Sequence, residues 1–158
     1  MAKTTAFFAA VAAKAWAYLL AMFLLALAAT GCSSFQREWR NAASTGSGSN
    51  GIDGRWVGIW RSDVNGHHGG LRCLISAVNE HEREAKFRAS YFGFLHFEYT
   101  VIFQAEHTND GWQVHGREDL GAAAGGLYYY DGFVTPARFQ ASYRCEADRG
   151  IFEMARPK

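Results

Sequence analysis

The 158-residue sequence predicts an all-β fold, an antiparallel meander of about eight short strands closed into a small barrel. Apolar and polar residues alternate along several segments, which is the period of a strand with one buried face. The composition suits strands and turns, with 17 glycines, 2 prolines and 15% aromatic residues. No long helical period follows residues 1–31. Closure removes the unpaired edges of a long meander, and a two-sheet β-sandwich is the alternative.

The first four expected strands show the alternation most clearly. In the first of them, Trp56 and Trp60 lie on one face of the strand. The fourth has the longest alternation, since every second residue from Phe97 to Phe103 is aromatic or aliphatic. Glycines and charged residues separate these strands and indicate loops. The expected ranges are 54–61, 71–78, 86–92 and 97–105.

Turn signals delimit the other four expected strands. The Asn-Asp-Gly sequence at 109–111 is typical of a hairpin turn and precedes the fifth strand. Asp-Gly at 131–132 ends the sixth strand, and Asp-Arg-Gly at 148–150 separates the last two. The Ala- and Gly-rich residues 120–126 are compatible with a loop or a tightly packed strand. The expected ranges are 112–116, 127–130, 137–145 and 151–156.

The N-terminal segment has the composition of a cleaved signal peptide. Residues 1–31 contain lysines but no acid, and their uncharged run at 15–29 is shorter than the roughly 20 residues of a spanning helix. Small residues then lead directly into Cys32. This pattern resembles the lipobox of bacterial lipoproteins, which implies cleavage between Gly31 and Cys32 and acyl chains, such as palmitate, on Cys32. An ordinary secretory signal and a retained membrane helix are the alternatives.

The lipobox resemblance implies a protein of the bacterial cell envelope that is held on a membrane by its lipid. Ser33 follows the cysteine, and in such lipoproteins an Asp at this position is associated with inner-membrane retention, so Ser33 implies the outer membrane. We expect three parts: a signal helix at 1–31, a flexible Gly/Ser tether at 32–51 and the β domain at 52–158. The formal net charge of +1 gives no indication of a nucleic-acid partner.

Two cysteines lie in the expected β domain. Cys73 and Cys145 form an even pair, which in an oxidising compartment favours a disulfide. In an up-and-down barrel, the second strand starts at the end where the seventh strand finishes. We therefore expect both sulfurs at one end of the barrel and predict a disulfide, with two buried free thiols as the alternative.

A second resemblance concerns the barrel itself. Gly54-Arg55-Trp56 on the first strand, the meander and Arg156 in the last strand are similar to the lipocalin and calycin pattern. The resemblance implies that Trp56 closes one end of the barrel. It also implies that Arg156, or alternatively Arg144, packs over the indole as a cation–π pair. It bears on architecture more than on function.

No spacing of chemistry-bearing residues indicates a catalytic or metal site, so we expect a non-enzymatic protein without metal or cofactor. The predicted inner face of the barrel is aromatic, which is compatible with a cavity for a small apolar ligand or with a packed core. The expected function is binding of a small apolar ligand or an envelope protein; a structural lipoprotein with a filled core is the alternative. The candidate ligand-lining residues are Tyr91, Phe97, Tyr99, Phe103, Tyr129, Phe139 and Tyr143.

Overall fold

The computed structural model describes residues 34–44 and 51–158. The chain divides into two compact units, Met1–Arg37 and Glu38–Lys158. The expected signal peptide, its cleavage site and Cys32 lie outside the described residues, as do residues 45–50 of the expected tether. Within the described ranges, no helix has both the length and the apolar character needed to cross a membrane.

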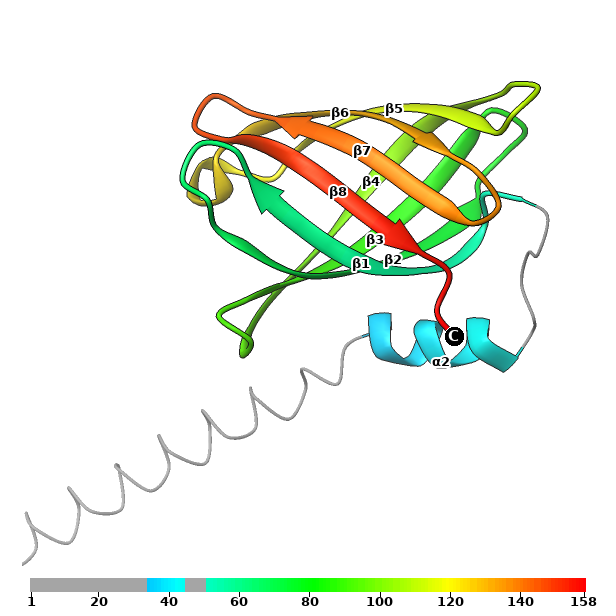
Figure 1. The fold of residues 1–158 in the computed structure, drawn as a ribbon, viewed down its shortest axis with the longest axis horizontal. Helices are drawn as coiled ribbons and strands as arrows, with labels where there is room; N and C mark the ends of the chain where they lie inside the picture. The colour runs from blue at the N-terminus through cyan, green and yellow to red at the C-terminus, as the bar shows by residue number, and fades with distance from the viewer. Residues whose placement is uncertain (1–33, 45–50) are drawn as a thin grey trace, which may run out of the picture. The chain divides into compact units, whose positions relative to one another are not determined.

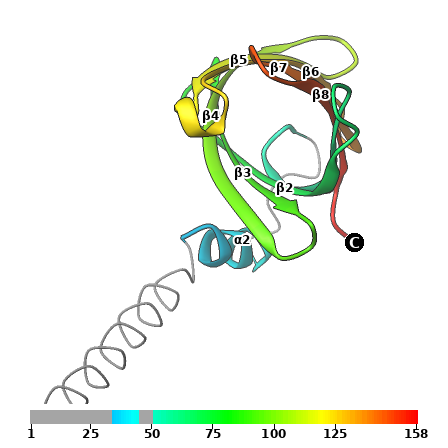
Figure 2. The same ribbon diagram turned by 90° about the vertical axis from the view of Figure 1, so that its left-hand side faces the viewer.

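The second unit contains a closed antiparallel barrel of eight strands (Figure 1). Each strand pairs with the next one along the chain, and the last pairs back with the first, so the strands form the complete ring seen in Figure 2. The predicted meander barrel is therefore confirmed, and the sandwich alternative is wrong. The strands are β1 (Gly54–Ser62), β2 (His68–Ala77), β3 (Glu82–Tyr91), β4 (Leu95–His107), β5 (Trp112–Asp119), β6 (Leu127–Val134), β7 (Arg138–Arg144) and β8 (Arg149–Ala155).

Two strands continue through glycines that looked like strand breakers in the sequence. β2 includes Gly69, where a Cβ atom would collide with the carbonyl oxygen of Ser90. β6 includes Gly132, where a Cβ atom would lie 2.7 Å from the Cβ of Ala141. These glycines permit close approach of neighbouring strands, so they extend the sheet instead of ending it. The segment at 120–126 is a loop with a short 3-10 helix, η1 (Ala122–Ala124).

Residues Ser34–Ser44 form the helix α2, which corrects the expectation of a flexible tether over this range. Phe35 and Trp39 are four residues apart and both are buried, so they share one face of the helix. The guanidinium carbons of Arg55 and Arg72 lie 5.4 and 5.6 Å from the centroid of the Trp39 ring. The apolar residues at helical spacing outweigh the polar composition that suggested a spacer.

The centre of the barrel is a packed aromatic and aliphatic core. Its largest fully buried side chains include Trp56, Phe87, Phe103 and Phe139. Phe103 meets both Phe87 and Phe139 edge to face, with ring centroids 6.1 and 6.2 Å apart. Edge-to-face packing of this kind fixes each ring against its neighbour. Phe103 and Phe139 were expected to line a cavity, and they form this solid core instead.

Candidate ligand cavity

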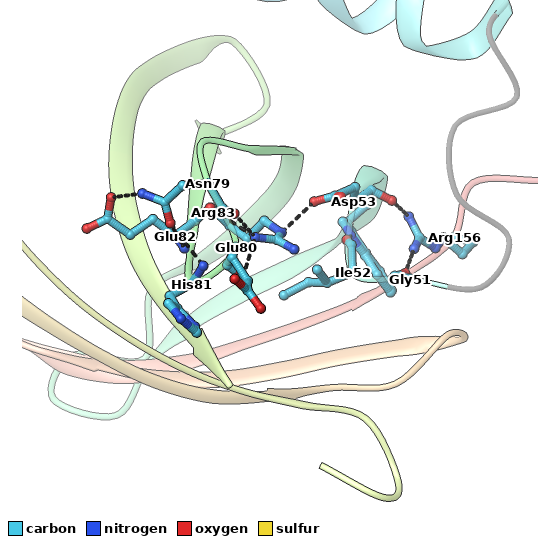
Figure 3. Close-up of polar contacts among 10 residues, drawn as sticks. Gly51, Ile52, Asp53, Asn79, Glu80, His81, Glu82, Arg83 and Arg156 are labelled. Carbon is cyan, nitrogen blue, oxygen red and sulfur yellow. Dashed lines mark hydrogen bonds and ion pairs between the residues drawn. The ribbon is translucent and has the colours of Figure 1, made fainter. Parts of the chain in front are cut away.

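One end of the barrel is closed by an arginine over a tryptophan. The Arg156 guanidinium carbon lies 3.8 Å from the Trp56 ring centroid. Its nitrogens donate to the carbonyl oxygens of Gly51 and Asp53, as Figure 3 shows. Burial lowers the pKa of Arg156, although Asp53 opposes this effect. This is the pair that the lipocalin resemblance implies; the alternative, Arg144, lies elsewhere.

A second arginine completes the closed end (Figure 3). Arg83 is only 8% exposed, and its Nη1 donates to the carbonyl oxygens of Asn79 and Glu82 at 2.7 and 3.0 Å. Its Nε lies 3.1 Å from Oδ1 of Asp53. The Arg83 guanidinium also lies over the Trp112 ring, 5.2 Å from the centroid. Nη1 of Arg83 therefore holds the β2–β3 turn, and its Nε lies within ion-pair distance of Asp53.

The opposite end of the barrel contains a cavity of about 550 Å³ that opens to solvent. Its walls come from β1, β3, β4, β6, β7 and β8 and from the loops that end them. Four of the expected lining residues line it: Tyr91, Phe97, Tyr99 and Tyr143. The full lining is Trp60, Ala89, Tyr91, Phe92, Leu95, Phe97, Glu98, Tyr99, Leu120, Ala124, Tyr128, Tyr130, Tyr143, Asp148 and Phe152.

Aromatic rings held against one another form most of the cavity wall. The Trp60 and Tyr91 ring centroids are 4.3 Å apart, and Tyr91 meets Phe97 edge to face at 5.6 Å. On the other side, Tyr143 stacks on Phe152 with centroids 5.1 Å apart. The Trp60 indole Nε1 donates to the carbonyl oxygen of Ser90 at 3.0 Å, which fixes its orientation. The rings are thus preorganised without a ligand.

The carboxylate of Asp148 forms a polar corner of this aromatic cavity. Asp148 Oδ1 accepts hydrogen bonds from the Ser62 hydroxyl at 2.6 Å and from the backbone N–H of Arg149 at 2.8 Å. Asp148 Oδ2 accepts a hydrogen bond from the Tyr143 hydroxyl at 3.0 Å. Burial raises the pKa of Tyr143, and the negative charge of Asp148 raises it further. The carboxylate is therefore fixed in position at the rim.

Tyr129 lies outside the cavity, which corrects its assignment to the inner face. It is 42% exposed on the outer face of β6, and the Arg144 guanidinium lies 5.2 Å from its ring centroid. Its neighbours Tyr128 and Tyr130 line the cavity instead. Three consecutive tyrosines carry no alternation, so the sequence did not distinguish their faces. Pairing of Tyr130 with Tyr143 across β6 and β7 decides which ones point inward.

Several lining residues were missed in the sequence. Trp60 carried a usable signal, because it lies four residues from Trp56 on one strand and so shares its face. Asp148 carried none, because an aspartate in an Asp-Arg-Gly turn is typical of any surface loop. Only closure of the barrel brings the turn after β7 to the rim beside β1.

The predicted disulfide between Cys73 and Cys145 is wrong, since both thiols are free. Cys73 is fully buried in the middle of β2, where it pairs with Trp56, and burial raises its pKa. Cys145 follows the end of β7, and β8 and β1 lie between that strand and β2. Three strand spacings amount to about 14 Å along the wall, well beyond the roughly 7 Å between Cα atoms that a disulfide can span.

Within residues 34–44 and 51–158, no group of three or more His, Cys, Asp or Glu residues is placed to hold a metal ion. Comparisons with protein-family models, curated proteins and solved structures give no match. What this chain binds is therefore argued from the geometry of its cavity.

Proposed function

We propose that the barrel binds a small apolar molecule in the cavity at its open end and that it catalyses no reaction on it. The observation that carries this proposal is the cavity of about 550 Å³ walled by aromatic rings. Ligand sites in proteins usually have volumes of about 300–1,000 Å³ and mostly apolar linings with a few fixed polar groups. The barrel is proposed to be of the lipocalin type, supported by its closed meander and by Arg156 over Trp56.

Preorganisation of the cavity favours binding. Each CH₂ group that a ligand buries contributes about 0.8 kcal/mol. The rings of Trp60 and Tyr143 already have hydrogen-bonded anchors, on Ser90 and Asp148. Side chains that are ordered before the ligand arrives lose little conformational entropy on binding. A ligand of modest size can therefore bind well here.

The test is calorimetric titration of the protein with decanol, used as a plain apolar probe. The variants Ala89→Phe and Leu120→Trp each add a large ring to the cavity lining and should weaken binding by about tenfold or more. Ala147→Phe adds the same ring on an exposed position of the β7–β8 turn and serves as the control. Absence of decanol binding, or equal binding by all variants, would favour the alternative of a structural protein with no ligand.

The barrel is proposed to be lipid-anchored through Cys32 on the bacterial outer membrane. The support is the lipobox-like sequence ending at Gly31 and the serine at position 33. Two or more acyl chains are enough for stable attachment to a bilayer. Intact mass of the membrane-extracted protein tests this: a chain that starts at Cys32 and carries acyl mass supports it. A Cys32→Ala variant that differs in mass only by the substituted side chain, and that keeps the same location, would contradict it.

A second candidate function, contact with a protein partner, is favoured by the tip of the β3–β4 hairpin. Phe92 and Phe94 are 73% and 72% exposed, and Leu95 follows them at 47%. Phe92 has a φ of 51°, which non-glycine residues rarely adopt. The test is to replace Phe94 by a photoreactive phenylalanine analogue and to cross-link in cells, with Val57 on the outer face of β1 as the control site. Equal cross-linking at both sites would contradict a specific contact.

A further inference from the structure

We infer that the cavity selects a positively charged apolar ligand, a hydrophobic amine or quaternary ammonium whose cationic head lies beside Asp148 and the surrounding aromatic rings. This inference rests on the proposed function, because it names the chemical class of ligand for the same cavity. Two independent features of the cavity carry it: the sign of the charges in its wall and the arrangement of aromatic rings around one carboxylate.

The charged residues of the cavity lining are all acidic. Asp148 and Glu98 are the two, and no Lys, Arg or His is found among the described residues that line it. Glu98 already forms an ion pair with Arg88, whose Nη1 lies 3.2 Å from its carboxylate. Asp148 has no ion pair with any described residue. An apolar anion would therefore be repelled by the unpaired negative charge of Asp148. A cation would instead form an ion pair with this carboxylate.

Arg149 follows Asp148 in the chain but does not neutralise the cavity. It is exposed at the start of β8 and lines a separate hollow on the outer face of the barrel, together with Arg144 and Tyr129. Successive side chains of a strand point to opposite faces, so the arginine points away from the interior. Its backbone N–H still donates to Asp148, which helps to orient the carboxylate without cancelling its charge.

The hydrogen bonds of Asp148 leave room for one more donor. A carboxylate accepts about four hydrogen bonds. Asp148 accepts two at Oδ1, from Ser62 and Arg149, and one at Oδ2, from Tyr143. Ser62 is only 2% exposed, so one of the donors that orient the carboxylate is a buried side chain. The remaining acceptor position of Oδ2 can receive an ammonium N–H, or a methylated ammonium can rest against the oxygen.

Aromatic rings share the cavity wall with Asp148. Trp60, Tyr91, Tyr128 and Tyr143 line the cavity together with Asp148. The faces of such rings attract cations, and tryptophan and tyrosine do so most strongly. Burial is the largest cause of the raised pKa of Tyr91, and the negative charge of Asp148 raises it further. It also contributes to the raised pKa values of Tyr128 and Tyr143, so its field reaches three of the four rings.

The experiment compares three probes with the same ten-carbon chain, below the concentrations at which they form micelles. Decyltrimethylammonium, decanol and decanoate carry a positive, a neutral and a negative head group. We expect decyltrimethylammonium to bind about tenfold or more tighter than decanol, and decanoate to bind weakest. Asp148→Asn should reduce the affinity for the cation to that for decanol. Glu146→Gln removes a charge from the same turn, at an exposed position outside the cavity lining, and should leave the preference intact.

The outcomes separate this inference from the proposed function. Decanol binding that equals or exceeds cation binding would overturn the inference and leave the apolar ligand site standing. Failure of all three probes to bind would overturn both. A preference for the cation that persists in Asp148→Asn would also overturn the role given to the carboxylate. If Asp148→Asn does not fold, as thermal unfolding would show, the three probes on the natural chain still decide the question.

Discussion

At the scale of single residues, Arg156 performs a structural task that no apolar residue could perform. Its guanidinium covers the Trp56 ring at 3.8 Å and also donates to the carbonyl oxygens of Gly51 and Asp53. Those carbonyl oxygens belong to the segment that leads into β1. One side chain therefore caps the core and ties both ends of the barrel sequence together.

Replacing Arg156 should destabilise the barrel measurably. We expect Arg156→Ala to lower the free energy of unfolding by about 2–4 kcal/mol, from the lost cation–π contact and the lost charged hydrogen bonds. Urea denaturation measures the change. Arg117→Ala removes an exposed arginine from β5 and should change stability by about 0.5 kcal/mol or less. Equal effects of the two substitutions would show that Arg156 does not act as a cap.

The two cysteines should react very differently. Cys73 is fully buried and burial raises its pKa, so its thiolate form is rare in the folded protein. Cys145 is half-buried beside the cavity rim. An alkylating reagent should therefore modify Cys145 in the native protein and Cys73 only after addition of denaturant, as peptide mass mapping would show. A Cys73–Cys145 cross-link found before reduction would contradict the free thiols.

At the scale of elements, the pairing of β1 with β8 closes the barrel and depends on a glycine. Gly58 pairs with Met154 across this seam. A Cβ atom at Gly58 would collide with the carbonyl oxygen of Glu153 and lie 2.6 Å from the Cα of Met154. Since both clashes involve backbone atoms, no side-chain rotation can relieve them. The close spacing of β1 and β8 at this position therefore requires glycine.

Gly58→Ala should weaken the barrel more than an ordinary glycine substitution. We expect a loss of about 1–3 kcal/mol in the free energy of unfolding, because the two strands must separate locally. Thermal unfolding followed by circular dichroism measures it. Gly51→Ala is the matched control, because nothing lies within 4 Å of the added Cβ there. A Gly58→Ala variant as stable as the control would mean that β1 and β8 tolerate a wider spacing.

At the scale of the whole molecule, buried tyrosines couple stability to alkaline pH. Burial is the largest cause of the raised pKa values of Tyr99 and Tyr130. An unfolded chain ionises its tyrosines near pH 10, whereas these phenols stay protonated in the folded protein. Raising the pH above about 10 therefore favours the unfolded state, and the stability present below that pH is lost.

The corresponding measurement follows tyrosinate absorbance and circular dichroism together as the pH rises. We expect several phenols to ionise only when the barrel unfolds, so that the two signals change together. Tyr99→Phe should remove one phenol from this cooperative step and leave the fold unchanged below about pH 10. Ionisation of all tyrosines near pH 10 in a barrel that remains folded would contradict the burial described for them.

The sequence by itself determined the class and topology of this fold. Alternation from Phe97 to Phe103 marked β4, and Asn-Asp-Gly at 109–111 marked the turn before β5. Both signals are local, because a strand with one buried face must alternate and a tight hairpin needs specific turn residues. The roles of Trp56 and Arg156 were also available from the sequence, through a family resemblance. In contrast, the helix at Ser34–Ser44 was missed because its polar composition outweighed the helical spacing of Phe35 and Trp39.

Only the tertiary structure decided which side chains form the cavity. Tyr129 and Tyr130 are equivalent in sequence, and the register of β6 against β7 assigns them to opposite faces. The distance between Cys73 and Cys145 depends on how far apart their strands lie around the ring. Asp148 meets Ser62, 86 positions away, only because β8 pairs with β1. These contacts join segments that are far apart in the chain and depend on closure of the barrel. Local sequence patterns therefore do not predict them.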